Sequence, residues 1–378
     1  MRVDERLRHP ELFGDLVQRR VGKTQIVEKV RRGFENASSL EVGDRFSDLL
    51  SLRFGWVHGE ASFQQSGNPT DKYTFLLYFD SMNLHPAIEA LVADPRMTVR
   101  VPPAHIPLDR IRNAANAAMT VGPAPKMAAV QDLRLGSDGE TVPVRVYRPT
   151  AALPNQAIVF CHGGGFVWGS LDTHDGLCRR MADRTRSTIV SVDYRLSPDA
   201  PFPAAETDVL LAATAVLEGK IAGLDRGCAV SLCGDSAGGY LACDATSRLV
   251  SKGLRPHRLV LIYPALDPDC GTDSHERNGA GPVLTSEAMR WFWAAHGIPA
   301  GRHFRDLGNL PDFPPAFLLN ADRDPLCDEG QMLLTDLKAA GVDAVGTTAV
   351  GMVHGFLSLP LPEDVRSRWE NEAFDYLA

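Results

Sequence analysis

One segment of the chain carries a serine in a setting typical of a nucleophile. Residues 229–240 read AVSLCGDSAGGY, and residues 234–238 match the pattern G-x-S-x-G around Ser236. In this pattern a strand turns sharply into a helix and pushes the serine hydroxyl clear of the sheet. Side chains two positions before and after the serine would collide in so tight a turn, which accounts for the two glycines. We therefore predict that Ser236 is an activated nucleophile.

A serine that attacks a carbonyl carbon needs donors for the negative charge that develops on the oxygen. Upstream, an apolar run at 158–161 leads directly into HGGGF at 162–166. Loops of this type supply backbone N–H donors to the oxyanion, and glycine lets the substrate carbonyl come close to the backbone. A further donor is expected from Ala237, the residue after the nucleophile. His162 is expected to fix the loop by hydrogen bonding rather than to act as a base.

The two remaining members of a serine triad should follow the serine, with the acid before the histidine. Asp324 lies beyond the apolar run at 316–320, directly before a proline, and His354 is the one histidine after it, in a glycine-flanked loop. We predict that His354 takes the proton of Ser236 and that Asp324 orients the imidazole. For Asp322 we predict an ion pair with Arg323 or a role in a turn.

These residues fall between elements in a regular α/β order. Near-continuous apolar runs predict buried strands at 158–161, 188–193, 229–233, 259–263 and 316–320. Such runs are typical of a sheet covered on both faces, and the helical patterns between them favour a mainly parallel sheet. In such sheets the functional residues gather beyond the carboxyl ends of the strands. A helix is also predicted over 329–340, with Asp328 as its N-cap and Gly341 after its end.

The first 120 residues have a different texture. Residues 1–32 carry nine Lys and Arg against five Asp and Glu, with apolar residues near helical spacing, and predict a solvated helix. Aromatic-rich runs at 54–63 and 73–79, on either side of a turn signal at 66–71, predict a hairpin or short sheet. Residues 85–120 read as helices interrupted by prolines.

Composition excludes several classes of function. The 378 residues are 44% hydrophobic and 23% charged, which is ordinary globular usage, and the net charge of −8 disfavours a nucleic-acid partner. No apolar run approaches the ~20 residues of a membrane span, so we expect no stable membrane insertion. The seven cysteines show no zinc-binding spacing and predict reduced, buried thiols. We expect a cytoplasmic protein with no metal and no cofactor.

Together these motifs resemble the hormone-sensitive-lipase-like family of α/β-hydrolases, the bacterial family IV esterases. The matching segments are HGGGFVWGS at 162–170, DYRLSPDAPFPAA at 193–205, GDSAGGYLA at 234–242, DPLCDEG at 324–330 and HGF at 354–356. The resemblance covers roughly residues 85–378. It implies an α/β-hydrolase fold with an eight-stranded, mostly parallel sheet, helices on both faces and a helical cap.

The resemblance also implies roles for individual residues. The residues at its matching positions are Ser236, Asp324 and His354 for the triad, and Gly164, Gly165 and Ala237 for the oxyanion hole. Gly163 is then mainly a turn residue. Weaker candidates for the substrate pocket are Phe166, Trp168, Asp235 and Met352, and aromatic residues 291–293 fall in the expected cap.

The expected domain organisation follows from the same resemblance. The catalytic domain should span 127–378 with a cap insertion near 273–297, and cap helices should span 85–126. Residues 1–84 are longer than the short helix with which such enzymes usually begin. We expect them to form an extension that serves as a lid or an oligomer contact.

The expected function is hydrolysis of carboxylic esters, with short- to medium-chain acyl groups or a small metabolite as substrate, through an acyl-Ser236 intermediate. The expected partner is the small-molecule ester, and the expected assembly is a homodimer. An amidase, a deacetylase or an arylformamidase would use the same triad, so the sequence leaves these alternatives open. A lyase or a ligand-binding protein on this scaffold is disfavoured, because the triad of Ser236, Asp324 and His354 is complete.

Overall fold

The chain divides into two compact units, Met1–Phe79 and Asp80–Ala378. The computed structural model describes residues 52–57, 60–65, 84–119, 124–137, 139–299, 301–302, 304 and 308–378. In the first unit, β1 (Leu52–Val57) and β2 (Glu60–Gln65) pair as an antiparallel hairpin. This hairpin falls largely within the first aromatic-rich run. The second run, the turn signal at 66–71 and the helix predicted in residues 1–32 lie outside the described residues.

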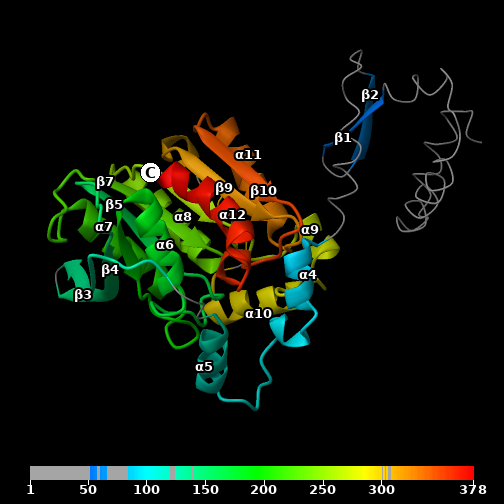
Figure 1. Ribbon diagram of the computed structural model, residues 1–378, viewed down its shortest axis with the longest axis horizontal. Coiled ribbons are helices and arrows are strands. Elements are labelled where there is room, and N and C mark those ends of the chain that lie inside the picture. Colours follow the sequence, from blue (N-terminus) through cyan, green and yellow to red (C-terminus); the bar gives the residue numbers. More distant parts are fainter. Residues whose placement is uncertain are drawn as a thin grey trace, which may run out of the picture. The chain divides into compact units, whose positions relative to one another are not determined.

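An eight-stranded sheet forms the centre of the second unit (Figure 1). In spatial order its strands are β10 (Ala344–Ala349), β9 (Ala316–Ala321), β8 (Leu259–Ile262), β7 (Ala229–Asp235), β5 (Gln156–Cys161), β6 (Thr188–Val192), β4 (Glu140–Arg148) and β3 (Ala129–Ser137). The strands from β10 to β6 are parallel, and β4 pairs antiparallel with both β6 and β3. The predicted fold class and all five predicted strands are confirmed.

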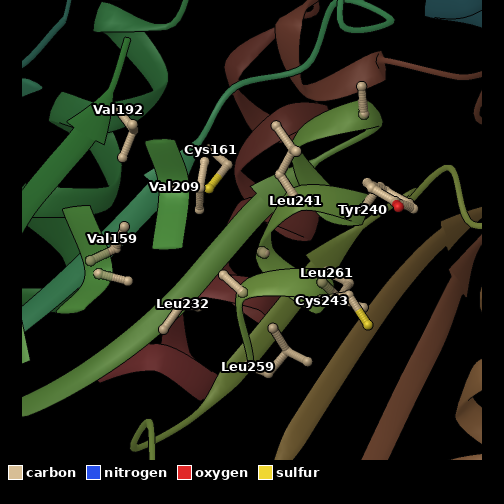
Figure 2. Packing of buried hydrophobic residues seen from close by; sticks show 14 of the residues in the cluster. Val159, Cys161, Val192, Val209, Leu232, Tyr240, Leu241, Cys243, Leu259 and Leu261 are labelled. Carbon is tan, nitrogen blue, oxygen red and sulfur yellow. The ribbon is translucent and has the colours of Figure 1, made fainter. Parts of the chain in front are cut away.

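Helices cover both faces of this sheet, and each face has its own hydrophobic core. The helices of one face are α7 (Ala204–Leu217), α8 (Ala237–Ser251) and α11 (Cys327–Ala339). The helices of the other face are α6 (Asp175–Thr185) and α12 (Glu363–Leu377). Because side chains alternate along a strand, Val159 and Cys161 of β5 join the first core (Figure 2), whereas Ile158 and Phe160 join the second. The site-bearing strands are therefore held from both sides.

Further helices lie outside the sheet and its covering helices. Before the sheet come α4 (Pro86–Val92), η2 (Pro95–Met97) and α5 (Leu108–Met119), and between β8 and β9 come α9 (Asp273–Arg277) and α10 (Ser286–His296). Arg112 of α5 donates from its guanidinium to the carbonyl oxygens of Val167 and Ser197, both at 2.8 Å. These bonds hold α5 against the segment that follows the glycine-rich loop. The proline-interrupted helices predicted over 85–120 are confirmed.

The predicted start of α11 is wrong. The helix begins at Cys327, so Asp328 lies in its first turn rather than at its N-cap. The carboxylate of Asp328 accepts instead from the Ser274 N–H at 2.8 Å and pairs with Arg277 at 2.8 Å. The turn that starts the helix is closed by Asp324, whose Oδ1 accepts from the Leu326 N–H.

All seven cysteines are free and buried. Burial raises the pKa of the Cys178 and Cys270 thiols to about 12. None of the helices in the part of the chain that the structure describes is both long and apolar enough to cross a bilayer.

Candidate active site

Ser236 lies in a sharp turn between the end of β7 and the start of α8. Its backbone has φ 55° and ψ −122°, a conformation with positive φ that costs free energy for a residue with a side chain. A Cβ atom at Gly234 would lie 2.1 Å from the Gly238 carbonyl oxygen, and one at Gly238 would lie 2.0 Å from the Cys161 carbonyl oxygen. Both glycines are therefore required sterically. The constraint on Gly238 comes from the neighbouring strand β5, not from across the turn.

A hydrogen-bonded chain joins the serine to a histidine and a buried carboxylate. Ser236 Oγ lies 2.8 Å from His354 Nε2, and His354 Nδ1 lies 2.7 Å from Asp324 Oδ2. Asp324 is fully buried, whereas Ser236 and His354 are each 8% exposed. Because a carboxylate only accepts, the proton of the neutral imidazole sits on Nδ1 and Nε2 is free to accept from the serine. The structure thus brings together the three residues that sequence order singled out.

Asp322 lies outside this chain and ties the acid loop to the histidine loop. Its Oδ1 accepts from the Gly351 N–H at 2.7 Å, and the Arg323 N–H donates to the Met352 carbonyl at 3.0 Å. Burial raises the pKa of Asp322 to about 6. The carboxylate also lies 3.5 Å from the Arg323 side chain. Asp322 therefore lies in a turn and pairs with Arg323, as predicted, and its side-chain hydrogen bond reaches Gly351 rather than His354.

The backbone N–H groups of Gly164, Gly165 and Ala237 have no hydrogen-bond acceptor within the described residues. Gly164 has φ 121°, and a Cβ there would lie 2.2 Å from the Trp168 carbonyl oxygen. Gly165 has φ 59°, and a Cβ there would lie 2.2 Å from the ring of Phe292 in α10. Ala237 is the first residue of α8, so the positive end of the helix dipole adds to its donor. These three N–H groups are suited to an oxyanion.

The glycine-rich loop is supported from beneath by a buried polar cluster. The Gly163 N–H donates to Asp235 Oδ1 at 2.8 Å, and His174 Nε2 lies 3.4 Å from the same oxygen. Burial opposes the charge of Asp235, but His174 and the Gly163 N–H hold the pKa of this carboxyl below its usual value. His162 stacks on Tyr194, whose hydroxyl donates to the His162 carbonyl at 2.7 Å. Burial lowers the pKa of His162 to about 3, so this imidazole is neutral.

The predicted pocket residues have mostly packing contacts. Phe166 is fully buried and stacks on His296 with ring centroids 4.0 Å apart. Trp168 packs edge-on against Phe292 at 4.6 Å, and Met352 is 1% exposed. The carboxylate of Asp235 faces the glycine-rich loop, as described above. Of this group, only Trp168 lies against the same side chain of α10 that covers Gly165.

Sequence reasoning missed two residues that support the site. His174 and Tyr194 complete the cluster beneath the glycine-rich loop. Tyr194 lies in the segment DYRLSPDAPFPAA that carried part of the resemblance, so a signal was present for it. His174 lies outside every motif and had no such signal. Within the described residues, no three or more His, Cys, Asp or Glu side chains gather as they would around a metal ion.

Comparison with known proteins identifies the class. A family model described as an alpha/beta hydrolase fold matches residues 158–358, which include the glycine-rich loop, Ser236, Asp324 and His354. The chain therefore belongs to the α/β-hydrolase fold family, and its predicted place among the hormone-sensitive-lipase-like esterases is confirmed.

Particular relatives are esterases. The chain is 34% identical over 297 residues to an ethyl acetate hydrolase of Pseudomonas putida. The matched region covers 74% of this chain and 93% of the relative. It is 37% identical over 241 residues to the esterase LipI of Mycobacterium tuberculosis, covering 60% of this chain and 75% of the relative. A mutant of an alpha/beta hydrolase enzyme from the metagenome of Lake Arreo, Spain, superposes with a TM-score of 0.70 at 30% identity, covering 78% and 97% of the two chains. The predicted activity class, carboxylic ester hydrolysis, is confirmed.

Proposed function

We propose that Ser236 attacks the carbonyl carbon of a small ester. As the bond from Oγ to carbon forms, the hydroxyl proton passes to His354 Nε2, which lies 2.8 Å away. The imidazolium is stabilised by Asp324, which accepts from Nδ1 at 2.7 Å. When the bond between carbon and the alcohol oxygen breaks, the alcohol leaves with the proton from His354. Water then attacks the acyl-Ser236 ester by the same route and releases the carboxylic acid.

The single observation that carries this proposal is that three backbone N–H groups with no acceptor among the described residues lie beside the hydrogen-bonded chain. Negative charge develops on the carbonyl oxygen as the tetrahedral intermediate forms. We propose that the N–H groups of Gly164, Gly165 and Ala237 receive that oxygen. Donors fixed in place before the reaction stabilise such charge without a cost of reorganisation.

For the substrate we propose esters of short acyl groups. Two observations support this choice. Ser236 and His354 are each only 8% exposed, and the ring of Phe292 lies directly against Gly165, so little room adjoins the proposed oxyanion hole. The relative from Pseudomonas putida is named for ethyl acetate, an ester of a two-carbon acid.

The test is hydrolysis of p-nitrophenyl esters from acetate to laurate by the wild type and by Ser236→Ala. We expect the highest kcat/KM at the short end of the series and a loss of roughly 10⁶ in kcat for the variant. Ser247→Ala is the matched control, since Ser247 is a buried serine further along the same helix α8. Diethyl p-nitrophenyl phosphate should add its phosphoryl group to the wild type and the control, as measured by intact mass, but not to Ser236→Ala.

Two results would contradict the proposal. Ester hydrolysis that survives in Ser236→Ala would remove Ser236 from the chemistry. A folded wild type that cleaves amides but no ester of the series would favour the amidase alternative, which the same triad can perform.

We also propose that the protein acts in the cytoplasm and as a homodimer. Seven free, buried thiols suit a reducing compartment. β10 is an edge strand of the eight-stranded sheet and exposes 43% of Val345, which suits pairing with a second copy. Fractionation of cells and light scattering of the purified protein test the two statements separately. A monomer mass at micromolar concentration would contradict the second.

A further inference from the structure

The loop that carries Asp324 is held from outside by one asparagine side chain. Asn278 Nδ2 donates to the carbonyl oxygens of both Asp322 and Asp324, each at 3.0 Å. A carbonyl oxygen can only accept, so these partners fix which end of the amide faces the loop. The two bonds span 44 and 46 residues of sequence. Asn278 follows the last residue of α9 and is half-buried.

These bonds hold the main chain of the residue whose carboxylate contacts His354. Asp324 Oδ1 accepts from the Leu326 N–H at 2.9 Å, and Oδ2 accepts from His354 Nδ1 at 2.7 Å. The first bond ties the carboxylate to the backbone of the acid loop, so its orientation toward His354 depends on the conformation of that loop. Asn278 fixes the carbonyl of Asp324. The Asp324 carbonyl also accepts from the Cys327 N–H, at 3.2 Å. Because the carboxylate is fully buried, a rotation of the peptide that turned it away from the imidazole would leave it without its hydrogen bond to His354.

A second contact from α9 supports the same loop. Ser274, which is fully buried, donates from Oγ to the Pro325 carbonyl at 2.5 Å and accepts from the Asp328 N–H at 3.1 Å. The acid loop is therefore bonded on one side to α9 and on the other to the histidine loop, through Asp322 and Gly351. The segment that supplies these contacts also leads into α10, whose Phe292 covers Gly165.

We propose that Asn278 is a positioning residue of the triad. By donating to both carbonyls, its amide sets the backbone of the acid loop so that the Asp324 carboxylate meets His354 Nδ1. This inference rests on the proposed roles of Ser236, His354 and Asp324. In this proposal the segment between β8 and β9 both packs over the glycine-rich loop and positions Asp324, which lies 46 residues after Asn278.

The test compares Asn278→Ala with Asn309→Ala. Asn309 is the matched control, because it is also half-buried and its Nδ2 donates to the Ser247 carbonyl and to Ser251 Oγ, both at 2.8 Å, at the far end of α8. Turnover of p-nitrophenyl acetate is measured per active site, titrated with diethyl p-nitrophenyl phosphate, so that any unfolded fraction does not count. We expect kcat to fall about 10- to 100-fold in Asn278→Ala with KM within twofold. In Asn309→Ala both constants should stay within twofold of wild type.

A spectroscopic readout separates positioning from general support of the fold. The proton between His354 Nδ1 and Asp324 gives a downfield proton resonance that reports this one hydrogen bond. We expect it to shift or broaden in Asn278→Ala and to stay in place in Asn309→Ala, even if both variants lose similar thermal stability. Asn278→Ser keeps one hydroxyl donor on a side chain that is one bond shorter and should have an intermediate kcat. This variant also replaces Asn278→Ala if the latter does not fold.

The inference would be overturned if Asn278→Ala, or Asn278→Ser in its place, matched Asn309→Ala in kcat and kept the resonance unchanged. Failure of the proposed function looks different: ester hydrolysis would survive in Ser236→Ala, or the folded wild type would cleave no ester of the series.

Discussion

The two sides of the proposed active site are built in different ways. On the oxyanion side, glycines set much of the geometry: Gly164 and Gly165 have positive φ, and Gly234 and Gly238 have no room for a Cβ. On the acid side, side chains distant in sequence hold the loop, such as Asn278 on the Asp322 and Asp324 carbonyls. A backbone conformation that requires glycine can be recognised in the sequence as a glycine motif. A backbone conformation that depends on a hydrogen bond from a distant side chain cannot.

This difference has a consequence for variants. A substitution on the oxyanion side meets fixed atoms and should act by blocking space. A substitution on the acid side removes a bond and should act by letting a loop move. That contrast can be tested with three variants, Asp324→Asn, Gly165→Ala and Asp322→Asn, in order of decreasing effect.

The strongest test on the acid side is Asp324→Asn. The Leu326 N–H already binds Oδ1, so the asparagine oxygen must stay there and its NH₂ must face His354 Nδ1. That arrangement puts the imidazole proton on Nε2, and a protonated Nε2 cannot accept the proton of Ser236. We expect a loss on the order of 10⁴ in kcat with little change in KM, measured by steady-state kinetics on p-nitrophenyl acetate.

The control for this prediction is Asp322→Asn. An asparagine oxygen can still accept from the Gly351 N–H that Asp322 binds at 2.7 Å, so we expect a loss of at most about tenfold. The reverse ranking would mean that Asp322, and not Asp324, orients His354.

On the oxyanion side the matching test is Gly165→Ala. The added methyl would lie 2.2 Å from the Phe292 ring and occupy space beside the proposed donors. We expect kcat to fall by roughly 10²–10³, the usual cost of losing one such donor. Because the obstacle is a side chain, the double variant with Phe292→Ala should recover part of the loss. Equal activity in the single and double variants would show that the positive φ, and not the contact, causes the defect.

The smallest effect concerns stability and pH. Burial raises the pKa of Asp322 from 3.8 to about 6 in the folded protein, so the native state binds this proton more tightly than the unfolded chain. The contribution of Asp322 to stability is therefore fully present below about pH 4 and is lost as the pH rises from there through about 6. Asp322→Asn removes this dependence. Relative to wild type, its free energy of unfolding should improve by about 1–2 kcal/mol between pH 4 and 7, allowing for solvent screening.

Urea unfolding of both proteins at pH 4, 5, 6 and 7 measures this difference, because the pH effects of all other groups cancel between them. Parallel curves for the two proteins would show that Asp322 titrates at its ordinary value.

Much of the sheet could be predicted because its central strands are buried on both faces. Strands at 158–161 and 259–263 appear in the structure as β5 and β8 with shifts of one or two residues. The strand β3 was not predicted, since it is mostly exposed at the sheet edge and shows no apolar run. The strand β4 was not predicted either, because its buried valines alternate with less buried residues instead of forming a continuous apolar run. A strand buried on both faces can be recognised from its run of apolar residues, whereas an exposed edge strand has no such run.

The candidate site follows the same rule. Ser236 and the HGGG loop were found from the spacing of glycines, and His354 from its order along the chain. Asn278 could not be found, because its two partners are main-chain carbonyls, which every residue possesses. The error at Asp328 has the same origin: its carboxylate binds the Ser274 N–H rather than its own helix. Bonds to a distant backbone leave no pattern in the side chains.

Because all seven thiols are buried, their reactivity reports on local unfolding of the protein. An alkylating reagent reacts only with thiolates that it can reach. Each cysteine is therefore labelled only after the surrounding part of the fold has unfolded locally. Cys327 lies beside the acid loop, Cys243 lies within α8, and Cys178 lies within α6. The order in which these positions become labelled would reveal which layer loosens first, without a single engineered probe.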